Sequence, residues 1–328
     1  MRAIAGLGAV TAGFPMVARG QSAGKGEAGV LPKGTVRIVV PFPPGGTADI
    51  IARLVGVRLA DSLGQTVIIE NRGGAGGNIG IASVARAAPD GLTLLMVSSA
   101  FVTNPALYPD KPPYDPIRQF SPICQLVNSP DVIVVAAKSP ITSLAELLAR
   151  ARKVPGTVTY ATPGNGNSVH LGGELLWQRA GVRLVHVPYS GAGPAVQAAL
   201  GDHVDCALSA LPAAKAHIAA GKLNALAVGG SKRWAELPQV PTVAESGFPG
   251  YRSETMQALL APVGTPAPVI TRLNADVRRI LATSDMQQQT RELGFEIVAS
   301  LPAELGERIA EDVPRWAAIA AKAGIRGD

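Results

Sequence analysis

The run of residues 36–53 constrains the fold more than any other part of the chain, because it reads as strand, tight loop and helix in direct succession. Residues 36–40 are mostly β-branched, residues 41–46 are proline and glycine with one phenylalanine, and the apolar residues that follow have helical spacing. Such a unit brings free backbone N–H groups and the positive end of a helix to one point, which suits a bound anion. Residues 157–180 form a second unit of the same kind, so we expect two anion-binding loops.

Strand-like and helix-like segments alternate along most of the chain and predict an α/β fold. The predicted strands span residues 36–40, 67–70, 92–97, 120–126, 132–136, 158–161, 184–187, 204–207, 225–229 and 254–261. The predicted helices span residues 48–63, 79–87, 144–152, 168–180, 194–200, 213–220, 266–282, 284–293 and 302–323. Alternation of this kind is typical of a mainly parallel sheet with helices on both faces.

The length of the chain and the order of its elements predict two lobes joined by a hinge. At 328 residues the chain exceeds the usual size of one domain. We expect lobe one to comprise residues 33–130 plus 253–328 and lobe two to comprise residues 131–252. Because the chain crosses twice between the lobes, the crossings predict a hinge, with an interlobe cleft at the carboxyl ends of the strands.

The composition supplies ample material for packed cores and argues against a nucleic-acid partner. Hydrophobic residues make up 47% of the chain and charged residues only 16%. The net charge of +6 is compatible with nucleic acid, an anionic surface or an anionic ligand. However, aromatic residues are only 4%, no run of Lys and Arg exceeds two, and no zinc-finger or helix-turn-helix pattern is found. The basic excess is therefore interpreted as a dispersed, solvated surface.

Residues 1–20 have the features of a signal peptide. Arg2 supplies a minimal positive region, residues 3–18 are largely apolar and small, and a cleavage site near Gly20 fits the pattern. The alternative is a leader with no targeting role. No later apolar run is long and uninterrupted enough to span a bilayer, so we expect the mature protein to be soluble. Together with the signal peptide, this predicts an exported, periplasmic protein.

Polar loops that follow predicted strands could meet at one site. Residues 43–49 combine stiffening prolines with glycines that admit a ligand close to the backbone. Residues 162–168 offer N–H groups, amides and hydroxyls at the start of a helix, where a carboxylate or phosphate could bind. Residues 188–194 form a third such junction, and residues 98–104 follow a further strand. Taken singly, each loop also fits an ordinary turn or helix cap.

The motifs of catalysis and metal binding are mostly missing. The glycine runs at residues 73–77 and 164–166 do not complete G-x-G-x-x-G, no Walker loop or H-E-x-x-H occurs, and the four histidines lack convincing metal spacing. We therefore expect neither a cofactor nor a metal. For His170, a packing or capping role is favoured over a catalytic one. Cys124 and Cys206 lie in apolar, strand-like segments and are interpreted as buried thiols, although export would permit a disulfide.

Several motifs together resemble one family. Residues 39–49 read V-V-P-F-P-P-G-G-T-A-D, and residues 70–80 read E-N-R-G-G-A-G-G-N-I-G. Residues 187–195 read V-P-Y-S-G-A-G-P-A, and residues 237–249 read L-P-Q-V-P-T-V-A-E-S-G-F-P. As a set, and in this order, they resemble the tripartite tricarboxylate transporter receptors, also called the Bug family, from about residue 33 to the C-terminus.

The resemblance implies a solute-binding protein with the two-lobed type II periplasmic-binding-protein fold. Such a receptor closes on a small carboxylate, commonly a di- or tricarboxylate, and presents it to a membrane permease; we expect it to act as a monomer. The family holds its ligand largely through backbone N–H groups and hydroxyls. The ligand-binding residues expected here, from the loops and the resemblance together, are Pro43, Gly45, Gly46, Thr47, Asp49, Ser98, Ser99, Asn104, Thr162, Gly164, Asn165, Gly166, Asn167, Ser168, His170, Tyr189, Ser190, Gly191 and Asp205.

Two other classes of function stay open at this point. A hydrolase or isomerase on the same bilobal scaffold would need a nucleophile or base beside an orienting partner, and His170 near Ser168 is the local candidate. The effector-sensing half of a transcription regulator can use a similar fold. The apparent signal peptide and the missing DNA-binding pattern argue against the regulator.

Overall fold

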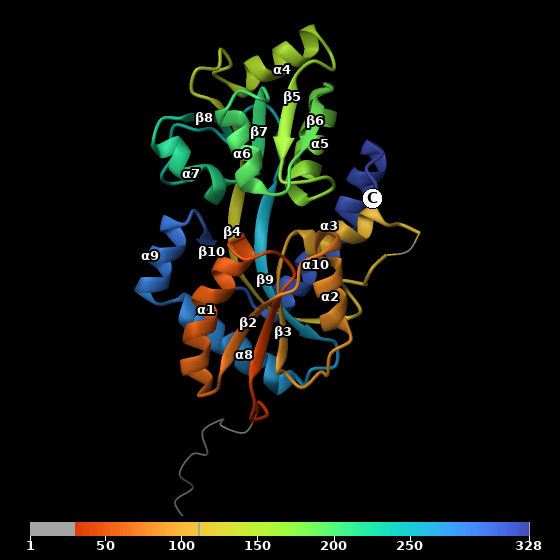
Figure 1. Ribbon diagram of the computed structural model, residues 1–328, viewed down its shortest axis with the longest axis vertical. Helices are drawn as coiled ribbons and strands as arrows, with labels where there is room; N and C mark the ends of the chain where they lie inside the picture. Colours follow the sequence, from red (N-terminus) through yellow and green to blue (C-terminus); the bar gives the residue numbers. More distant parts are fainter. Residues whose placement is uncertain (1–29, 111, 328) are drawn as a thin grey trace, which may run out of the picture.

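The computed structural model describes residues 30–110 and 112–327, so the predicted signal peptide, residues 1–20, lies outside the described residues. Two halves are stacked along the longest axis of the molecule (Figure 1). Two long strands, β4 (Phe120–Ala136) and β9 (Glu254–Pro262), run between the halves. Within the described ranges, no helix has the length and apolar character needed to cross a membrane.

Each half contains a sheet that mixes parallel and antiparallel strands. The other strands are β1 (Val36–Val40), β2 (Val67–Asn71), β3 (Thr93–Ser98), β5 (Thr159–Thr162), β6 (Val185–Pro188), β7 (Cys206–Ala210), β8 (Leu223–Val228) and β10 (Glu296–Ile297). In the lower half β1 is parallel to β2 and β3, and in the upper half β5 is parallel to β6 and β7. The expectation of a mainly parallel sheet is wrong for the remaining strands. In each described pairing of one strand with another, β4, β8, β9 and β10 run antiparallel to their partners.

Strand β4 belongs to both sheets. It is one continuous strand, where the sequence predicted two strands over residues 120–126 and 132–136. Up to Pro130 it pairs with β9, and from Asp131 onward it pairs with β7 and β8. At the changeover, the hydroxyls of Ser253 and Thr255 donate hydrogen bonds of 2.5 and 3.0 Å to the buried Asp131 carboxylate. These bonds tie together the two strands that connect the halves.

Helices cover both faces of each sheet. They are α1 (Thr47–Leu63), α2 (Asn78–Ala85), α3 (Ala100–Leu107), α4 (Leu144–Lys153), α5 (Ser168–Ala180), α6 (Ala192–Leu200), α7 (Leu211–Ala219), α8 (Ala267–Leu281), α9 (Ser284–Glu292) and α10 (Pro302–Ala323). Side chains alternate between the faces of a strand, so Ile38 packs in the core under α1 and α8 while Val39 packs in the core on the side of α2, α3 and α10.

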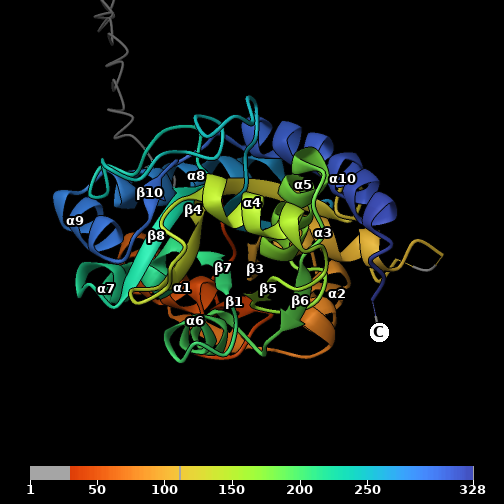
Figure 2. The same ribbon diagram turned by 90° about the horizontal axis from the view of Figure 1, so that it is seen from above.

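The two halves also touch through α5, which follows β5 of the upper sheet. Leu171 of α5 is fully buried in the lower half's core beside Phe101 and Trp316. Figures 1 and 2 both show α5 beside α10, which carries Trp316. The contact between the halves is therefore apolar on this side of the molecule.

Helix α3 and the short strand β10 were not predicted. Residues 98–104 were expected to form a polar loop, but a helix begins at Ala100 and contains Pro105. Its residues Phe101 and Val102 are almost completely buried. Burial of these side chains therefore outweighs the weak local helix signal that Thr, Asn and Pro give the segment.

Candidate ligand-binding site

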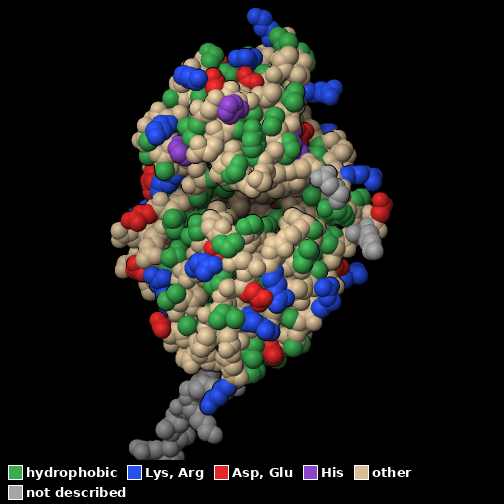
Figure 3. Space-filling model, in the orientation of Figure 1, with side chains coloured by type: hydrophobic (Ala, Val, Ile, Leu, Met, Phe, Trp, Pro, Cys, Tyr) green, Lys and Arg blue, Asp and Glu red, His purple; other side chains and the backbone are tan. Residues whose placement is uncertain are grey.

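Three helices begin where the two halves face each other. Helix α1 follows β1, α5 follows β5 and α6 follows β6, and the carboxyl ends of these strands point toward the middle of the molecule (Figure 1). The surface is hollowed at this height, between the upper and lower halves (Figure 3). The N-caps of α1 and α6 are Gly46 and Gly191, and no side chain among the described residues caps either helix. Their first N–H groups are therefore available to a ligand.

Asp49 shapes the first loop from inside. The residue is 2% exposed, and its carboxylate accepts hydrogen bonds from Gly45 N (2.9 Å), Arg53 Nε (2.9 Å) and Asn71 Nδ2 (3.0 Å). Burial alone would raise the pKa of Asp49, but the hydrogen bonds from Arg53, Gly45 and Asn71 hold it below its usual value. The carboxylate thus holds the loop in place, while Pro43 and the loop glycines are exposed at its tip.

Thr47 is held by a residue that the sequence reading missed. The Gln257 side-chain amide donates to Thr47 Oγ1 over 3.0 Å, and Gln257 is fully buried. Since that bond uses Thr47 Oγ1 as an acceptor, the hydroxyl proton of Thr47 stays free to donate to a ligand. Gln257 pairs in register with Ser98, so β9 places the Gln257 side chain at the end of β3, within reach of the start of α1. A glutamine inside the otherwise apolar residues 256–262 of β9 was the signal that could have found it.

The side chains of Ser99 and Asn104 form hydrogen bonds with other groups of the protein. Ser99 Oγ accepts from Met256 N over 2.9 Å and so fixes the end of β3 to β9. Asn104 lies in α3, and its Nδ2 donates to Gly76 O (2.9 Å) and to Asn78 Oδ1 (2.8 Å). Both residues position loops, whereas Ser98 is only partly buried.

The second loop is also pinned by its own side chains. Thr162 Oγ1 lies 2.7 Å from His186 Nε2 and donates to Gly164 O. Asn167 caps α5, because its Oδ1 accepts from His170 N over 2.9 Å. These bonds fix the loop before any ligand arrives.

His170 has a packing and positioning role. Its Nδ1 accepts a 2.9 Å hydrogen bond from Gly166 N, and its ring stacks on His186 with the centroids 3.6 Å apart. Burial, and then the charge of a protonated His186, lower the pKa of His170 to about 3. Burial likewise lowers the pKa of His186 to about 4. Both rings are therefore neutral at physiological pH.

The second loop touches the lower half directly. Gly166 has a φ of +69°, and a Cβ placed there would lie 2.4 Å from Leu107 Cδ1 at the end of α3. Asn165 Nδ2 donates to Arg326 O over 3.2 Å. The structure therefore brings residues 162–168 against the end of the helix that begins after β3.

Comparison with known proteins identifies the family. Residues 51–325 match the tripartite tricarboxylate transporter family receptor. The chain belongs to this receptor family. The receptor is 35% identical over 302 residues to Protein BugT of Bordetella pertussis, and the match covers 92% of each chain. Members of this family are solute-binding receptors with the two-lobed periplasmic-binding-protein fold.

Two solved structures are similar to this receptor over nearly their whole length. R. palustris Rpa4515 with adipate is 35% identical, with a TM-score of 0.81 and coverage of 89% of this chain and 98% of its own. MatC from Rhodopseudomonas palustris with bound malate is 34% identical, with a TM-score of 0.78 and coverage of 87% and 98%.

One residue that was predicted to contact the ligand lies away from the binding loops. Asp205 accepts hydrogen bonds from Thr159 N (2.8 Å) and Thr159 Oγ1 (2.9 Å), and it pairs with Arg150 at 3.3 Å. Thr159 begins β5, whereas Thr162 at the other end of the strand starts the second loop. The prediction of Asp205 as a ligand contact is therefore wrong, because its carboxylate is held at the far end of the strand.

The remaining predicted residues lie after β5 and β6. Tyr189 N donates to Thr162 O over 3.0 Å and links the two loops, while Ser190 is exposed beside Gly191. The thiols of Cys124 and Cys206 are both buried and free, so the receptor has no disulfide between them.

Proposed function

We propose that this protein is a periplasmic receptor that holds a small organic carboxylate, such as a di- or tricarboxylate, between its two halves and delivers it to a membrane permease. The observation that carries the proposal is the pair of uncapped helix starts, at Thr47 and Ala192, which follow strands that end toward the middle of the molecule from opposite halves (Figure 1). The relatives Rpa4515 and MatC, with adipate and malate, support this class of ligand.

The energetics suit reversible capture. A helix N-terminus contributes about 0.3–1 kcal/mol to anion binding at exposed sites and more when it is partly buried. Closure of the halves excludes water and strengthens each hydrogen bond to the carboxylate. Thr47 would donate its hydroxyl proton to one carboxylate oxygen, and the rest of the ligand would lie toward Ser98 and Tyr189. We place the hinge at residues 130 and 253, as the order of elements predicts, and propose that one chain suffices for binding.

We propose no catalytic step for this site. An enzyme on this scaffold would need a base beside a reacting group, and the local candidate is His170. Its Nδ1 is occupied by Gly166 N and its ring is stacked on His186, which supports a positioning role.

Calorimetry with protein that has been unfolded and refolded to strip retained ligand tests the proposal. We expect at least one of adipate, malate and citrate to bind with micromolar or tighter affinity, and hexanediol, the uncharged analogue of adipate, not to bind. Equal binding of adipate and hexanediol would contradict a carboxylate site, as would no binding of any organic acid in a wider panel. Turnover of an ester or hydroxy-acid panel that is lost in His170→Ala would instead favour the enzyme.

Export has its own test. If residues 1–20 are a signal peptide, the protein in a periplasmic extract should begin near residue 21. N-terminal sequencing checks this. A protein that begins at Met1 and stays in the cytoplasmic fraction would exclude the periplasmic role and would favour a cytoplasmic effector sensor.

A further inference from the structure

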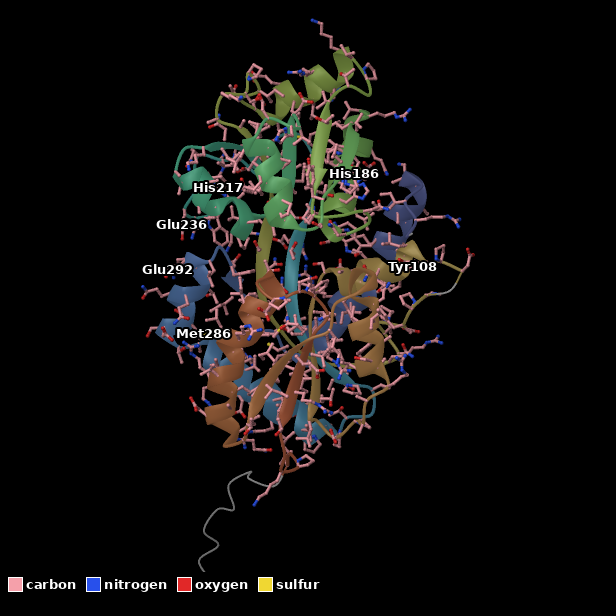
Figure 4. The ribbon with its side chains drawn as sticks, in the orientation of Figure 1. Tyr108, His186, His217, Glu236, Met286 and Glu292 are labelled. Atoms are coloured by element: carbon pink, nitrogen blue, oxygen red, sulfur yellow. The ribbon has the colours of Figure 1, made fainter. Side chains whose placement is uncertain are left out.

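A second cavity lies at the hinge and shares no lining residue with the binding loops. Its volume is about 510 Å³, within the range of small-molecule sites. The upper half supplies the segment after β8, residues 230–236, and the lower half supplies α9 and β10; the connecting strands β4 and β9 form its floor. Figure 4 labels Glu236 of the upper half and Glu292 of the lower half on the two sides of the gap at this edge. We call this cavity the hinge pocket.

The hinge pocket has an apolar wall and two unpartnered polar atoms. Trp234, Phe295 and Ile297 line it, and Phe295 is only 2% exposed. Asn128 is 9% exposed and also lines the pocket, and its Oδ1 has no hydrogen-bond partner among the described residues. Trp234 Nε1 is likewise buried without a partner there. An aromatic ligand with a hydrogen-bond donor would complement this wall.

The charges around the hinge pocket leave one cation unpaired. All three carboxylates that line the pocket form ion pairs. Glu296 pairs with Lys232 at 2.6 Å. Glu236 pairs with Lys215 at 2.7 Å, and Glu254 pairs with Arg252 at 3.1 Å. Arg233 pairs with Glu245 at 2.9 Å.

Arg291, near the end of α9, is the exception. Its guanidinium makes no hydrogen bond or ion pair with any described residue, yet the residue lines the pocket. The surplus of one positive charge favours a monoanion. A guanidinium binds a carboxylate through two parallel hydrogen bonds, in a bidentate arrangement.

We propose that the hinge pocket is a second ligand site, for a small aromatic carboxylate that carries a hydroxyl group. Its carboxylate binds the Arg291 guanidinium, its ring packs on Trp234 and Phe295, and its hydroxyl donates to Asn128 Oδ1. Because both halves contribute walls, the occupant couples to their relative position, and its affinity differs between open and closed forms. This site is spatially separate from the one that we place between the helix starts, since the two share no lining residue.

Titration of the full chain with three probes tests the assignment. The probes are para-hydroxybenzoate, benzoate, which lacks the hydroxyl, and para-hydroxybenzamide, which lacks the charge. We expect para-hydroxybenzoate to bind best and each of the other two to bind at least about tenfold more weakly, since each loses one hydrogen-bonded contact. No detectable binding of para-hydroxybenzoate at millimolar concentration overturns the proposal.

Variants then locate the bound probe. Arg291→Gln should weaken para-hydroxybenzoate binding at least about tenfold, whereas the control Arg86→Gln, an exposed arginine at the end of α2, should leave it unchanged. Asn128→Leu should remove the preference for para-hydroxybenzoate over benzoate while benzoate still binds, which also shows that this variant is folded. Equal affinity in Arg291→Gln and Arg86→Gln overturns the proposal. So does binding that is lost in Gly166→Val, because the probe would then occupy the interlobe site.

Discussion

Replacing Gly166 by valine is expected to weaken carboxylate binding by at least about 100-fold, which corresponds to about 3 kcal/mol. Gly166 has a φ of +69°, which strains any β-branched residue, and an added Cβ would lie 2.4 Å from Leu107 Cδ1 and 3.1 Å from Leu107 Cγ. Leu107 is buried and cannot simply turn aside. The second loop must therefore move away from α3, and with it the hydrogen bond from Gly166 N to His170. Calorimetry with the best-bound organic acid measures the loss.

Gly181→Ala is the matched control for this experiment. Gly181 ends α5 with a φ of +64°, and nothing lies within 4 Å of an added Cβ. The variant therefore has the backbone strain without the clash, and we expect about 1 kcal/mol of lost stability with unchanged ligand affinity. If Gly166→Val binds as tightly as Gly181→Ala, the second loop does not contact the ligand.

The free energy of unfolding is expected to fall as the pH drops from about 6.5 toward 3. The pKa of His170 is about 3 in the folded protein, against 6.5 in an unfolded chain, so acid favours the unfolded state. His186, with a pKa of about 4, acts in the same direction. Asp131 acts oppositely between about pH 6 and 4, because burial raises its pKa to about 6 and its protonation favours the folded state. Burial also raises the pKa of Glu174, which opposes the histidines in the same way, whereas the lowered pKa of Asp49 acts with them. We expect the two histidines to dominate, with a net loss of roughly 3 kcal/mol near pH 4.

Urea unfolding at several pH values separates the contribution of His170. In His170→Gln the amide oxygen can still accept from Gly166 N, but the side chain does not titrate, so stability should depend less steeply on pH than in the natural protein. His203→Gln, which removes an exposed histidine, should give a curve parallel to that of the natural protein. Parallel curves for both variants would mean that protonation of the buried stack does not drive the acid sensitivity.

Hydrophobic periodicity predicted most elements to within one or two residues. Helix α5 was predicted with its observed bounds, Ser168–Ala180, because Asn167 caps it and Gly181 ends it. The first strand, Val36–Val40, was likewise predicted as observed. Where the local signal was weak, burial decided: α3 forms from a segment that contains Pro105, and β4 continues through Pro130 because it pairs on both sides of that residue.

For the candidate site, the positions of the loops could be predicted from local sequence, but the roles of individual side chains could not. The loops after β1, β5 and β6 were predicted from glycines, helix caps and the family motifs, and in the structure all three strands end toward the middle of the molecule, where the two halves face each other (Figure 1). The roles of individual side chains were harder to predict. Asp49, Ser99 and Asn104 make hydrogen bonds to other parts of the protein, and Asp205 lies at the opposite end of β5.

Local pattern was enough to establish an α/β chain, the helix starts and the family of this protein, because strand, turn and cap preferences act over a few neighbouring residues. The three-dimensional packing alone decided that Gln257 holds Thr47, 210 residues away in the sequence, and that Gly166 lies against Leu107. It also decided that residues 230–236 and 287–297 enclose a second cavity. Such contacts depend on strand register and on the seating of one half against the other, which no short stretch of sequence encodes.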